Sequence, residues 1–441
     1  MNTAARRKRS RRHRSRRPGR RYERTYETRS KAVQKEDPIK RRSFFYGRLP
    51  RQDVELMLLR DGEFLVRKTQ KKTAELRGMC ISTKSRGKIY HVLIRRTNEK
   101  TVKLEDMEFS TVDQLVRYYL KTQKPLIRDM QIIISRPVHR ADWVLYNDQI
   151  ELIKKLGEGN YGEVWKAICT KKKEGKKMKK EVAVKFFKDL EVVNEEEKDF
   201  FGECRKQKQL SHLHVVKFIG IVMNSERPKL VMELCDTNLL RHLKTAKHPI
   251  SLSEKFCFAL QIVYGMEYLV QESIIHRDLA ARNCLIKKDI LKISDFGMAR
   301  SGKIFHAMDR NVMLPIKWTA PEAVETGIFS EKTDVWAFGI TLWELFSNGK
   351  SPYADLETKY KENFPDELVK FLTDGKRLSS PSYTPPDAYD LMLQCWNKNS
   401  NIRPTFTQIR GTVEVMYAAS GGMLSCRETD EDRYDDDDDF Y

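Results

Sequence analysis

The feature that most constrains the fold of this chain is the separation of strand-like from helix-like sequence in its larger part. From about residue 150 to 234, β-branched and alternating stretches predict strands, whereas residues 235–417 read mostly as helices. Segregated halves of this kind predict two lobes with a cleft between them, and charged, catalytic-looking loops lie between the predicted helices. A lysine-rich run at 171–180, between two predicted strands, is interpreted as an exposed hairpin loop.

One of these loops, "IIHRDLAARNCLI" at 274–286, carries an acid and an amide five positions apart, Asp278 and Asn283. Phosphoryl transfer needs positioning and charge neutralisation rather than covalent help. The Asp278 carboxylate can accept or orient an attacking hydroxyl, and the Asn283 carboxamide can ligate a metal without adding charge. Downstream, Asp295 in "ISDFGMAR" offers a hard oxygen ligand of the kind that Mg²⁺ prefers.

A glycine-rich stretch, "LGEGNYGEV" at 156–164, connects two predicted strands. Glycines let the backbone approach a polyphosphate closely, and the lack of a following helix disfavours a dinucleotide-binding loop. Lys185 in "EVAVKFF" lies in an apolar strand, where its ammonium group can hold phosphates. A buried lysine needs a partner, and Glu203 on the next predicted helix is the candidate.

Taken in order, these motifs resemble the protein-kinase signature set. The matching positions are Gly157, Gly159, Gly162, Lys185, Glu203, His276, Arg277, Asp278, Asn283, Asp295, Phe296 and Gly297, followed by "APE" at 320–322, "DVWAFG" at 334–339 and "NIRP" at 401–404. The resemblance implies ATP and Mg²⁺ as cofactors. It assigns catalysis to Asp278 and Lys185, and metal binding to Asn283 and Asp295.

The same resemblance implies how the nucleotide and the scaffold are held. The nucleotide-binding positions that it implies are Leu156, Gly157, Glu158, Gly159, Asn160, Gly162, Val164, Ala183, Lys185, Glu203, Met232, Glu233, Cys235 and Leu285. Glu322 and Arg403 are expected to form a structural ion pair. Asp334 is expected to brace the loop that carries Asp278.

The residues after Asp278 separate the subclasses of this family. Serine/threonine kinases usually carry a lysine two residues after the catalytic aspartate, where this chain has Ala280. Arg282 and the stretch "LPIKWTAPE" at 314–322 instead resemble tyrosine kinases. Because a phenolic hydroxyl stands farther from its backbone than a serine hydroxyl, a differently placed cation is physically sensible. The resemblance implies protein substrates with tyrosine and a catalytic role for Arg282.

A smaller module, predicted as helix, strands and helix, precedes the two lobes. Arg67 in "FLVR" lies on an apolar strand, and a partly buried arginine suits a bidentate anion. The segment "FFYGRLPRQDVELMLLRDGEFLVR" resembles the Src homology 2 (SH2) domain, with Arg67 as the phosphate-gripping arginine. By the same resemblance, Arg51 and His91 support the phosphotyrosine ring and Thr69 donates to the phosphate. Lys68 replaces the usual acid, which makes the pocket more basic.

An SH2 module joined by a short connector to a tyrosine kinase resembles the Fes/Fer group of nonreceptor kinases. We therefore expect an α+β fold, in which the SH2 module is followed by a bilobal kinase domain with a β-rich N-lobe and an α-rich C-lobe. The expected divisions are a disordered arm at 1–42, the SH2 domain at 43–136, a linker at 137–149, the kinase domain at 150–417 and a disordered acidic tail at 418–441. Phosphotyrosine-containing proteins are the implied partners, in intracellular signalling.

Two stretches depart from the pattern of this group. The segment "DLETKYKENFPDELVKF" is longer than the pattern. Between Asp295 and Glu322 there is no tyrosine, and Phe305 occupies about the place of the autophosphorylated tyrosine of the group. In the group, the phosphate on that tyrosine partly neutralises Arg277. We hypothesise that the loop is ordered without phosphorylation, helped by Asp309 or by docking of the SH2 module on the small lobe.

Charge is concentrated at the two ends of the chain. The net charge is +21, of which residues 1–42 contribute +14 and residues 418–441 contribute −7. The arginine-rich arm predicts a peripheral association with an anionic membrane such as the plasma membrane, and a nuclear location is the alternative. Binding to nucleic acid is not expected, because no aromatic stacking platform accompanies the arginines. The acidic tail is expected to solvate the chain, with Tyr434 as a candidate phosphorylation site.

The remaining composition indicates a cytosolic or nuclear protein. No apolar run reaches the length of about 18 residues that a membrane span needs, and no apolar segment follows the arginines at the start as in a secretory signal. The eight cysteines show no metal-type spacing, which favours reduced thiols. A monomer is expected.

Two other classes of function fit parts of the chain. A pseudokinase adaptor would bind phosphotyrosine without transferring phosphate, but such proteins usually lack the lysine, the catalytic aspartate or the metal-binding aspartate, and Lys185, Asp278 and Asp295 are all present. Alternatively, the basic arm could carry the main function, and the kinase would then be secondary.

Overall fold

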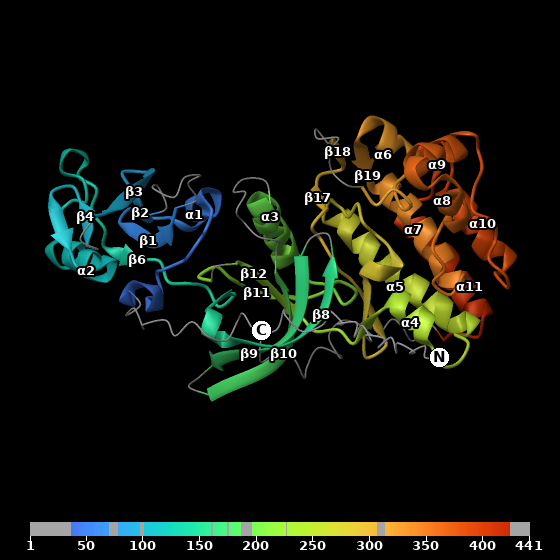
Figure 1. Ribbon diagram of the computed structural model, residues 1–441, viewed down its shortest axis with the longest axis horizontal. Coiled ribbons are helices and arrows are strands. Elements are labelled where there is room, and N and C mark those ends of the chain that lie inside the picture. The colour runs from blue at the N-terminus through green and yellow to red at the C-terminus, as the bar shows by residue number, and fades with distance from the viewer. Residues whose placement is uncertain are drawn as a thin grey trace, which may run out of the picture.

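The computed structural model describes residues 37–69, 78–97, 101–159, 162–173, 176–186, 196–225, 227–306 and 314–423. A small α+β module, a lobe built on one sheet and a helical lobe follow one another along the long axis of the molecule, so the expected fold class is confirmed (Figure 1). Among the described helices, none has both the length and the apolarity needed to cross a bilayer. Asn160, Asp309 and Tyr434 lie outside the described residues, and the expectations placed on them stay predictions.

The small module is built on a six-stranded sheet with the order β5-β4-β3-β2-β1-β6. Its elements are the 3-10 helix η1 (Pro38–Arg41), α1 (Arg51–Met57), β1 (Glu63–Lys68), β2 (Met79–Ser85), β3 (Lys88–Arg96), β4 (Val102–Leu104), β5 (Met107–Phe109), α2 (Val112–Thr122), η3 (Arg128–Met130) and β6 (Arg136–Pro137). Thr111 caps α2 by accepting the Gln114 N–H. The apolar face predicted for α2 is buried, and consists of Val112, Leu115, Val116 and Tyr119.

The module begins earlier in the chain than the sequence indicated. Ile39 in η1 is fully buried in the module core, and Arg42 Nε lies 2.5 Å from Asp113 Oδ1 on α2. The boundary expected between residues 42 and 43 therefore moves to about residue 37. A single apolar anchor among basic neighbours was too weak a signal to separate these residues from the arm.

The expected linker, residues 137–149, is part of the folded structure. Its strand β7 (Val144–Leu145) pairs in parallel with β11 (Phe218–Val222) and forms one edge of the sheet of the small lobe. The Trp143 carbonyl accepts the Ile221 N–H at 2.8 Å, and a Cβ atom at Gly220 would lie 2.4 Å from that carbonyl oxygen. Glycine is therefore required where the connector crosses β11.

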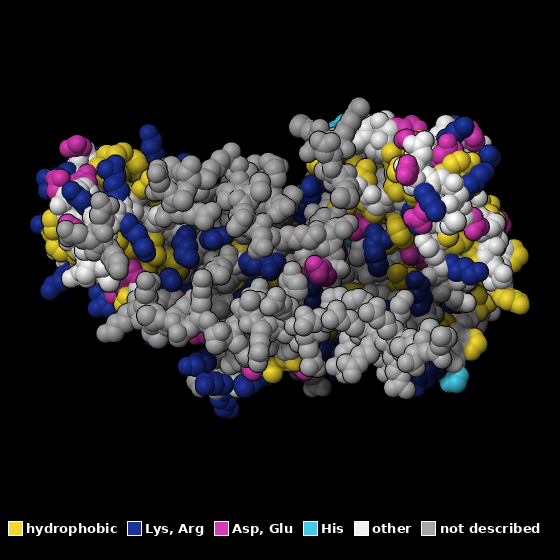
Figure 2. Space-filling view, viewed as in Figure 1, with side chains coloured by type: hydrophobic (Ala, Val, Ile, Leu, Met, Phe, Trp, Pro, Cys, Tyr) yellow, Lys and Arg dark blue, Asp and Glu magenta, His cyan; other side chains and the backbone are white. Residues whose placement is uncertain are grey.

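The small lobe contains a six-stranded sheet with the order β7-β11-β12-β10-β9-β8. Its other elements are the 3-10 helix η4 (Asn147–Gln149), β8 (Ile150–Gly159), β9 (Gly162–Lys173), β10 (Lys176–Phe186), α3 (Glu196–Gln209) and β12 (Lys229–Glu233). The lysine-rich run was expected to be a loop, but the β9–β10 ladder continues through it to the pair Lys173 and Lys176. Basic side chains gather at this end of the hairpin (Figure 2). The described residues of the run are therefore mostly strand, and of these Lys172, Lys176, Lys177 and Lys179 are exposed as expected.

The large lobe is mostly helical and surrounds α7 (Glu331–Phe346), which is buried from Thr333 onward. The other helices are α4 (Leu239–Thr245), α5 (Leu252–Gln271), α6 (Pro321–Thr326), α8 (Ala354–Tyr360), α9 (Phe364–Thr373), α10 (Pro386–Cys395), α11 (Phe406–Ala419) and the 3-10 helices η5 (Ala281–Asn283), η6 (Lys361–Asn363) and η7 (Ser400–Ile402). Its short strands are β13 (Thr237–Asn238), β14 (Ile274–Ile275), β15 (Cys284–Lys287), β16 (Ile290–Ile293), β17 (Arg300–Ser301), β18 (Ile304–His306) and β19 (Ile328–Ser330). A helix that is apolar all round belongs in a core, which explains the central place of α7.

The segment that is longer than the group pattern, residues 355–371, folds as most of α8, all of η6 and most of α9. Glu357 on α8 accepts a hydrogen bond from Lys317 Nζ at 2.7 Å. Lys317 Nζ also lies 5.6 Å from the centre of the Phe364 ring at the start of α9. The extra residues therefore pack against the expected substrate loop, 314–322.

The SH2-like module packs directly on the small lobe. Its residues Leu49 and Val54 share one buried apolar cluster with Phe201 and Cys204 of α3. Asp53 on α1 accepts two hydrogen bonds from Arg205 on α3, at 2.8 and 3.0 Å, and α1 and α3 lie side by side in Figure 1. The docking considered from the sequence is thus present, whereas its effect on activity stays a prediction.

Candidate active site

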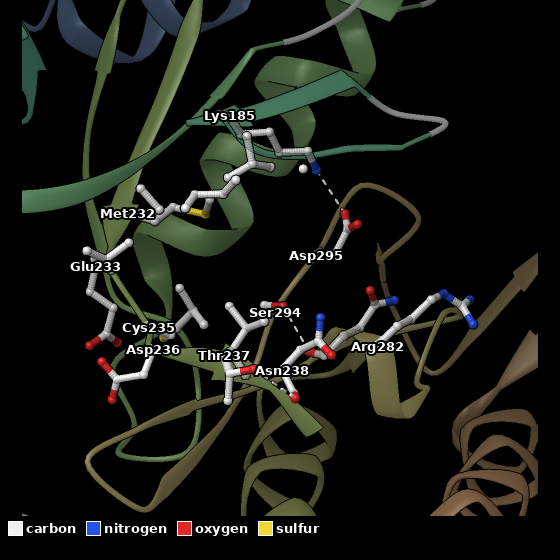
Figure 3. Close-up of a pocket in the computed structure, with 18 of the residues that line it drawn as sticks. Lys185, Met232, Glu233, Cys235, Asp236, Thr237, Asn238, Arg282, Ser294 and Asp295 are labelled. Carbon is white, nitrogen blue, oxygen red and sulfur yellow. Dashed lines mark hydrogen bonds and ion pairs between the residues drawn. The ribbon is translucent and has the colours of Figure 1, made fainter. Parts of the chain in front are cut away.

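A cleft of about 300 Å³ lies between the two lobes, and Figure 3 shows the side chains that line it. The predicted site residues that line it are Leu156, Gly157, Val164, Ala183, Lys185, Glu203, Met232, Glu233, Cys235, Arg282, Asn283, Leu285 and Asp295. Four other predicted residues are not in this lining: Glu158, Gly159 and Gly162, which lie where β8 and β9 approach each other, and Asp278, which bonds to the lining residues Arg282 and Asn283. Asn160 lies outside the described residues. The sequence did not single out Asp236, Thr237, Asn238 and Arg241, which also line the cleft.

Apolar side chains form part of the cleft wall, and the charged groups of Lys185, Glu203 and Asp295 form its polar end. Leu156, Val164 and Ala183 come from the small lobe, and Leu285 from β15 of the large lobe. Sites that bury a small molecule combine such apolar walls with a few convergent polar groups. The arrangement fits a flat aromatic base at one end and phosphates at the other.

Glu233 contributes to this site differently from the other lining residues. Its carboxylate accepts the Lys217 N–H at 2.7 Å, and it lies within 3.2 Å of Lys287 Nζ and Lys292 Nζ. The Glu233 side chain is only 4% exposed, and removing a carboxylate from water costs free energy. The two lysine cations offset that cost. The side chain thus links the segment between the lobes to Lys217, Lys287 and Lys292.

At the polar end, Lys185 on β10 joins both lobes electrostatically. Its Nζ lies 2.8 Å from Glu203 Oε1 on α3 and 2.8 Å from Asp295 Oδ1 in the loop after β16 (Figure 3). Although burial alone would lower the pKa of Lys185, the two carboxylates raise it, and the ammonium stays charged. The pairing of Lys185 with Glu203, expected from the need of a buried lysine for a partner, is confirmed.

Asp278 and Asn283 face each other across the catalytic loop. The 3-10 turn η5 brings Asn283 Nδ2 to 2.9 Å from Asp278 Oδ2, and Arg282 donates to the other carboxylate oxygen of Asp278. Asp278 is 5% exposed, and this burial raises the pKa of its carboxyl group to about 6, while Arg282 opposes the increase. The spacing noted in the sequence thus joins the acid and the amide in one turn of chain.

Buried groups of the large lobe hold the catalytic loop in place. Asp334 on α7 accepts the N–H groups of His276 and Arg277 at 2.8 and 2.9 Å, as expected for a brace. Arg277 has a positive φ of 68°, a conformation that costs a non-glycine residue free energy and needs such support. The expected pair of Glu322 and Arg403 is also present, with N–O distances of 2.6 and 2.8 Å.

Glu344 on α7 is a site residue that the sequence analysis missed. It is 1% exposed and accepts hydrogen bonds from the Ala281 N–H at 3.0 Å and from Trp318 Nε1 at 2.9 Å. The Arg282 guanidinium carbon lies 4.2 Å from the centre of the Trp318 ring. One buried acid therefore ties the catalytic loop to the substrate loop. An acid within an apolar helix was the available signal, because a buried carboxylate must have partners.

The residues predicted to bind phosphotyrosine lie near one another on the small module, and their role stays a prediction. Arg67 is 6% exposed and donates through Nε to Ser82 Oγ at 3.1 Å, and His91 Nδ1 lies 2.9 Å from the same oxygen. Arg51 Nε donates to Glu55 at 2.9 Å, and Glu55 also lies 3.7 Å from His91 Nε2. The sequence thus predicted the three basic residues, but it did not reveal that Glu55 lies between two of them.

Thr69 follows β1, the strand that carries Arg67. Its hydroxyl donates to the Gly78 carbonyl at 3.1 Å and accepts the Gly78 N–H at 3.0 Å. These bonds close the two ends of the segment 70–77, which lies outside the described residues. The predicted donation from Thr69 to a phosphate stays a prediction.

Comparison with known proteins agrees with both parts of this geometry. Residues 150–413 match the family of protein tyrosine and serine/threonine kinases, and residues 44–119 match the SH2 domain. Fer-related kinase 1 of Caenorhabditis elegans is 35% identical over 388 residues, which cover 86% of this chain and 95% of that protein.

Longer relatives share the same region. The human tyrosine-protein kinase Fer is 32% identical over 386 residues, covering 86% of this chain and 44% of Fer. The transforming protein Fps of avian sarcoma virus, strain PRCII, is 34% identical over 373 residues, covering 84% of this chain and 66% of Fps. The chain thus spans less than half the length of human Fer. With an SH2 domain packed on a bilobal kinase domain, it belongs to the nonreceptor protein tyrosine kinases related to Fer and Fps.

Proposed function

We propose that this nonreceptor tyrosine kinase transfers the γ-phosphoryl group of ATP to tyrosine hydroxyls through Asp278, Lys185 and Arg282. The observation that carries the assignment is a pair of charged clusters at one cleft, where Asp278 bonds to the lining residues Arg282 and Asn283. Lys185, Glu203 and Asp295 form one cluster, and Asp278, Arg282 and Asn283 form the other. Enzymes of this class need the lysine pair and the positioned aspartates together, because catalysis rests on placement and charge neutralisation.

Asp278 would orient the attacking phenolic hydroxyl and accept its proton as the new phosphate ester bond forms. A carboxyl group with a pKa of about 6 is ionised at neutral pH, yet it remains basic enough to take up that proton. The Arg282 guanidinium, bonded to the same carboxylate, stabilises its ionised form. Lys185 would turn its ammonium to the phosphates of the bound nucleotide, while Glu203 keeps it in place.

The two proposed metal ligands suit Mg²⁺ by their chemistry. Asp295 offers carboxylate oxygens and Asn283 a carboxamide oxygen, and both line the polar end of the cleft. Mg²⁺ is commonly held by one or two such groups together with substrate phosphates, and it neutralises phosphate charge when bound. The Asn283 amide nitrogen is already directed to Asp278, which leaves its oxygen as the group available to a metal.

Selection of tyrosine would rest on the contact between the catalytic loop and the substrate loop. Arg282 lies over the Trp318 ring. Glu344 accepts hydrogen bonds from both the catalytic loop and the substrate loop and so fixes their relative position. Ala280 leaves out the lysine that serine/threonine kinases usually carry at this position. Trp318 and Arg282 thus form a rigid wall beside Asp278, which favours an acceptor whose hydroxyl stands at the end of an aromatic ring.

The SH2 domain would bind phosphotyrosine-containing proteins through Arg67, with Arg51, His91 and Thr69 in supporting roles. We place the protein in the cytoplasm as a monomer. The arm at 1–42 would add a peripheral contact with anionic membrane at the plasma membrane, or alternatively direct the protein to the nucleus. Of this arm, the structure describes only residues 37–42, which fold with the SH2 domain.

Replacement of Asp278 by asparagine tests the assignment against the adaptor alternative. Asp278→Asn should lower phosphotyrosine formation on a tyrosine peptide by about 10²- to 10⁴-fold, because the general base is lost. Binding of a phosphopeptide by the SH2 domain should be unchanged, which controls for folding. Phosphotyrosine formation at the wild-type rate by Asp278→Asn would remove Asp278 from the mechanism. Absence of transfer by the wild-type protein would support an adaptor.

A further inference from the structure

The loop that follows Asp295 makes an unusual contact with the catalytic loop. Arg277 immediately precedes Asp278, and its guanidinium carbon lies 4.1 Å from the centre of the Phe329 ring and 4.7 Å from that of Phe305. Its Nη1 also donates to the Met298 carbonyl at 3.1 Å. Arg277 is only 6% exposed, so its charge is largely removed from water.

The backbone brings the two rings together. The strands β18 and β19 lie next to each other (Figure 1). They pair in antiparallel fashion, and Phe305 is the direct partner of Phe329. Phe329 is 1% exposed and belongs to a small buried cluster against which Phe305 and Leu314 pack. Ile304, the neighbour of Phe305 in β18, is 61% exposed. The alternation along the strand therefore turns Phe305 inward, toward the charge of Arg277.

The faces of these rings can partly neutralise the positive charge of Arg277, as an anion would. An aromatic ring carries partial negative charge on its face, and it attracts a guanidinium group more strongly when water is excluded. No tyrosine lies between Asp295 and Glu322, so this segment cannot acquire a phosphotyrosine to neutralise Arg277. Phe305 supplies a permanent contact with Arg277. In other members of the group, a tyrosine that is reversibly phosphorylated occupies about this place.

We propose that Phe305 is a positioning residue for the transfer reaction. Together with Phe329 it holds the side chain of Arg277, whose backbone is in the strained φ of 68° directly before Asp278. The catalytic loop is thereby kept in place without phosphorylation of the segment from Asp295 to Glu322. The inference rests on the proposed role of Asp278. It implies that the enzyme is active from its first turnover, with no lag for autophosphorylation.

The test compares the full-length protein with Phe305→Leu, Phe305→Tyr and the matched control Ile304→Leu. Leucine keeps an apolar side chain in the cluster but removes the ring, whereas tyrosine keeps the ring. Each protein is treated with a phosphatase, the phosphatase is removed, and initial rates on a tyrosine peptide are measured with thermal unfolding midpoints. We expect the wild type to keep its rate within about twofold, with no lag.

The variants separate a positioning role from a packing role. Phe305→Leu should lower kcat about tenfold or more, because small displacements of a catalytic group are costly, while the KM for ATP and the unfolding midpoint stay near those of the wild type. Phe305→Tyr, assayed after phosphatase treatment, should retain the wild-type kcat, and so should Ile304→Leu. Full kcat in Phe305→Leu, or a loss of kcat matched by a lower unfolding midpoint, would overturn the proposal.

The activity of the wild type before and after phosphatase treatment gives the remaining test. Loss of most wild-type activity after phosphatase treatment would also overturn the role of Phe305, because it would show that activity depends on a phosphate. Such a result would leave the proposed function standing. In contrast, a wild-type protein that forms no phosphotyrosine before phosphatase treatment would contradict the proposed function itself.

Discussion

At the scale of single residues, the electrostatic balance around Asp278 governs the chemistry. Burial raises the pKa of its carboxyl group to about 6, and Arg282 limits that increase. Asn283 donates to the carboxylate and adds a smaller stabilisation of the ionised form. The acid is therefore poised near the pH at which the enzyme would operate, which is the condition for efficient general-base catalysis.

This balance predicts a pH dependence. Because Asp278 must be ionised to accept a proton, kcat/KM should rise with pH through about 6 and fall as the pH drops below it. Arg282→Gln removes the cation that lowers the pKa of Asp278, so the midpoint of the acid limb should move to higher pH. The measurement is kcat/KM for a tyrosine peptide between pH 5 and 8, a range of about one unit or more on either side of that value.

Arg410→Gln serves as the matched control, because Arg410 lies on α11 and pairs with Glu267 on α5, on elements that do not form the cleft. This variant should leave the midpoint of the acid limb where it is in the wild type. An unchanged midpoint in Arg282→Gln would show that Asp278 does not set the acid limb.

At the scale of secondary-structure elements, α3 contacts both the cleft and the SH2 domain. It carries Glu203, which holds Lys185 inside the cleft, and two residues later Arg205, which bonds to the SH2 domain. The cluster that contains Leu49, Val54 and Phe201 continues this contact through apolar packing. We therefore expect the position of Glu203 to depend on a domain outside the kinase lobes.

A charge exchange across this interface tests the dependence. Asp53→Arg places like charges together at α1 and α3, and should lower kcat/KM about fivefold, because a partly exposed pair contributes up to about 1 kcal/mol. The double variant Asp53→Arg with Arg205→Asp restores opposite charges and should recover most of the activity. Initial rates on a tyrosine peptide provide the measurement.

Asp129→Arg is the control for this experiment, because it reverses an exposed acid of the same domain. Its activity should match that of the wild type. If Asp53→Arg were as active as the control, α3 would hold Glu203 without help from the SH2 domain, and the coupling would be ruled out.

At the scale of the whole molecule, basic residues are grouped in two segments of the chain. Residues 1–42 carry +14, and a second group of basic side chains extends from the end of the β9–β10 hairpin (Figure 2). Each basic residue close to an anionic membrane contributes about 1 kcal/mol to binding, and salt screens this attraction. Either group could thus supply an electrostatic contact with a membrane.

Deletion of residues 1–36 separates the two basic groups, because the described core of the SH2 domain begins after them. The full chain should sediment with vesicles that contain phosphatidylserine, and the deletion variant should lose most of this binding. Raising the salt concentration should release the full chain, whereas activity on a soluble peptide should be equal in both proteins. Equal sedimentation of the two proteins would show that another basic surface, such as the hairpin, makes the membrane contact instead of the arm.

The sequence by itself determined those parts of the protein that depend on local spacing and on the need to compensate buried charge. Asp278 and Asn283 meet because five positions of chain form one tight turn. The partner of Lys185 was predictable, because a lysine in an apolar strand requires a nearby acid. The apolar face of α2 followed from helical periodicity, and the order of strand-rich and helix-rich sequence predicted the lobes.

Only the tertiary structure decided the contacts between residues far apart in the chain. Glu344 with Trp318, Asp53 with Arg205, and Phe305 with Arg277 are pairs whose members lie on different elements. The addition of β7 to the sheet of the small lobe likewise depends on the path of the connector. Periodicity describes one element at a time, whereas such contacts depend on how separate elements pack, and that is set by the burial of apolar surface over the whole molecule.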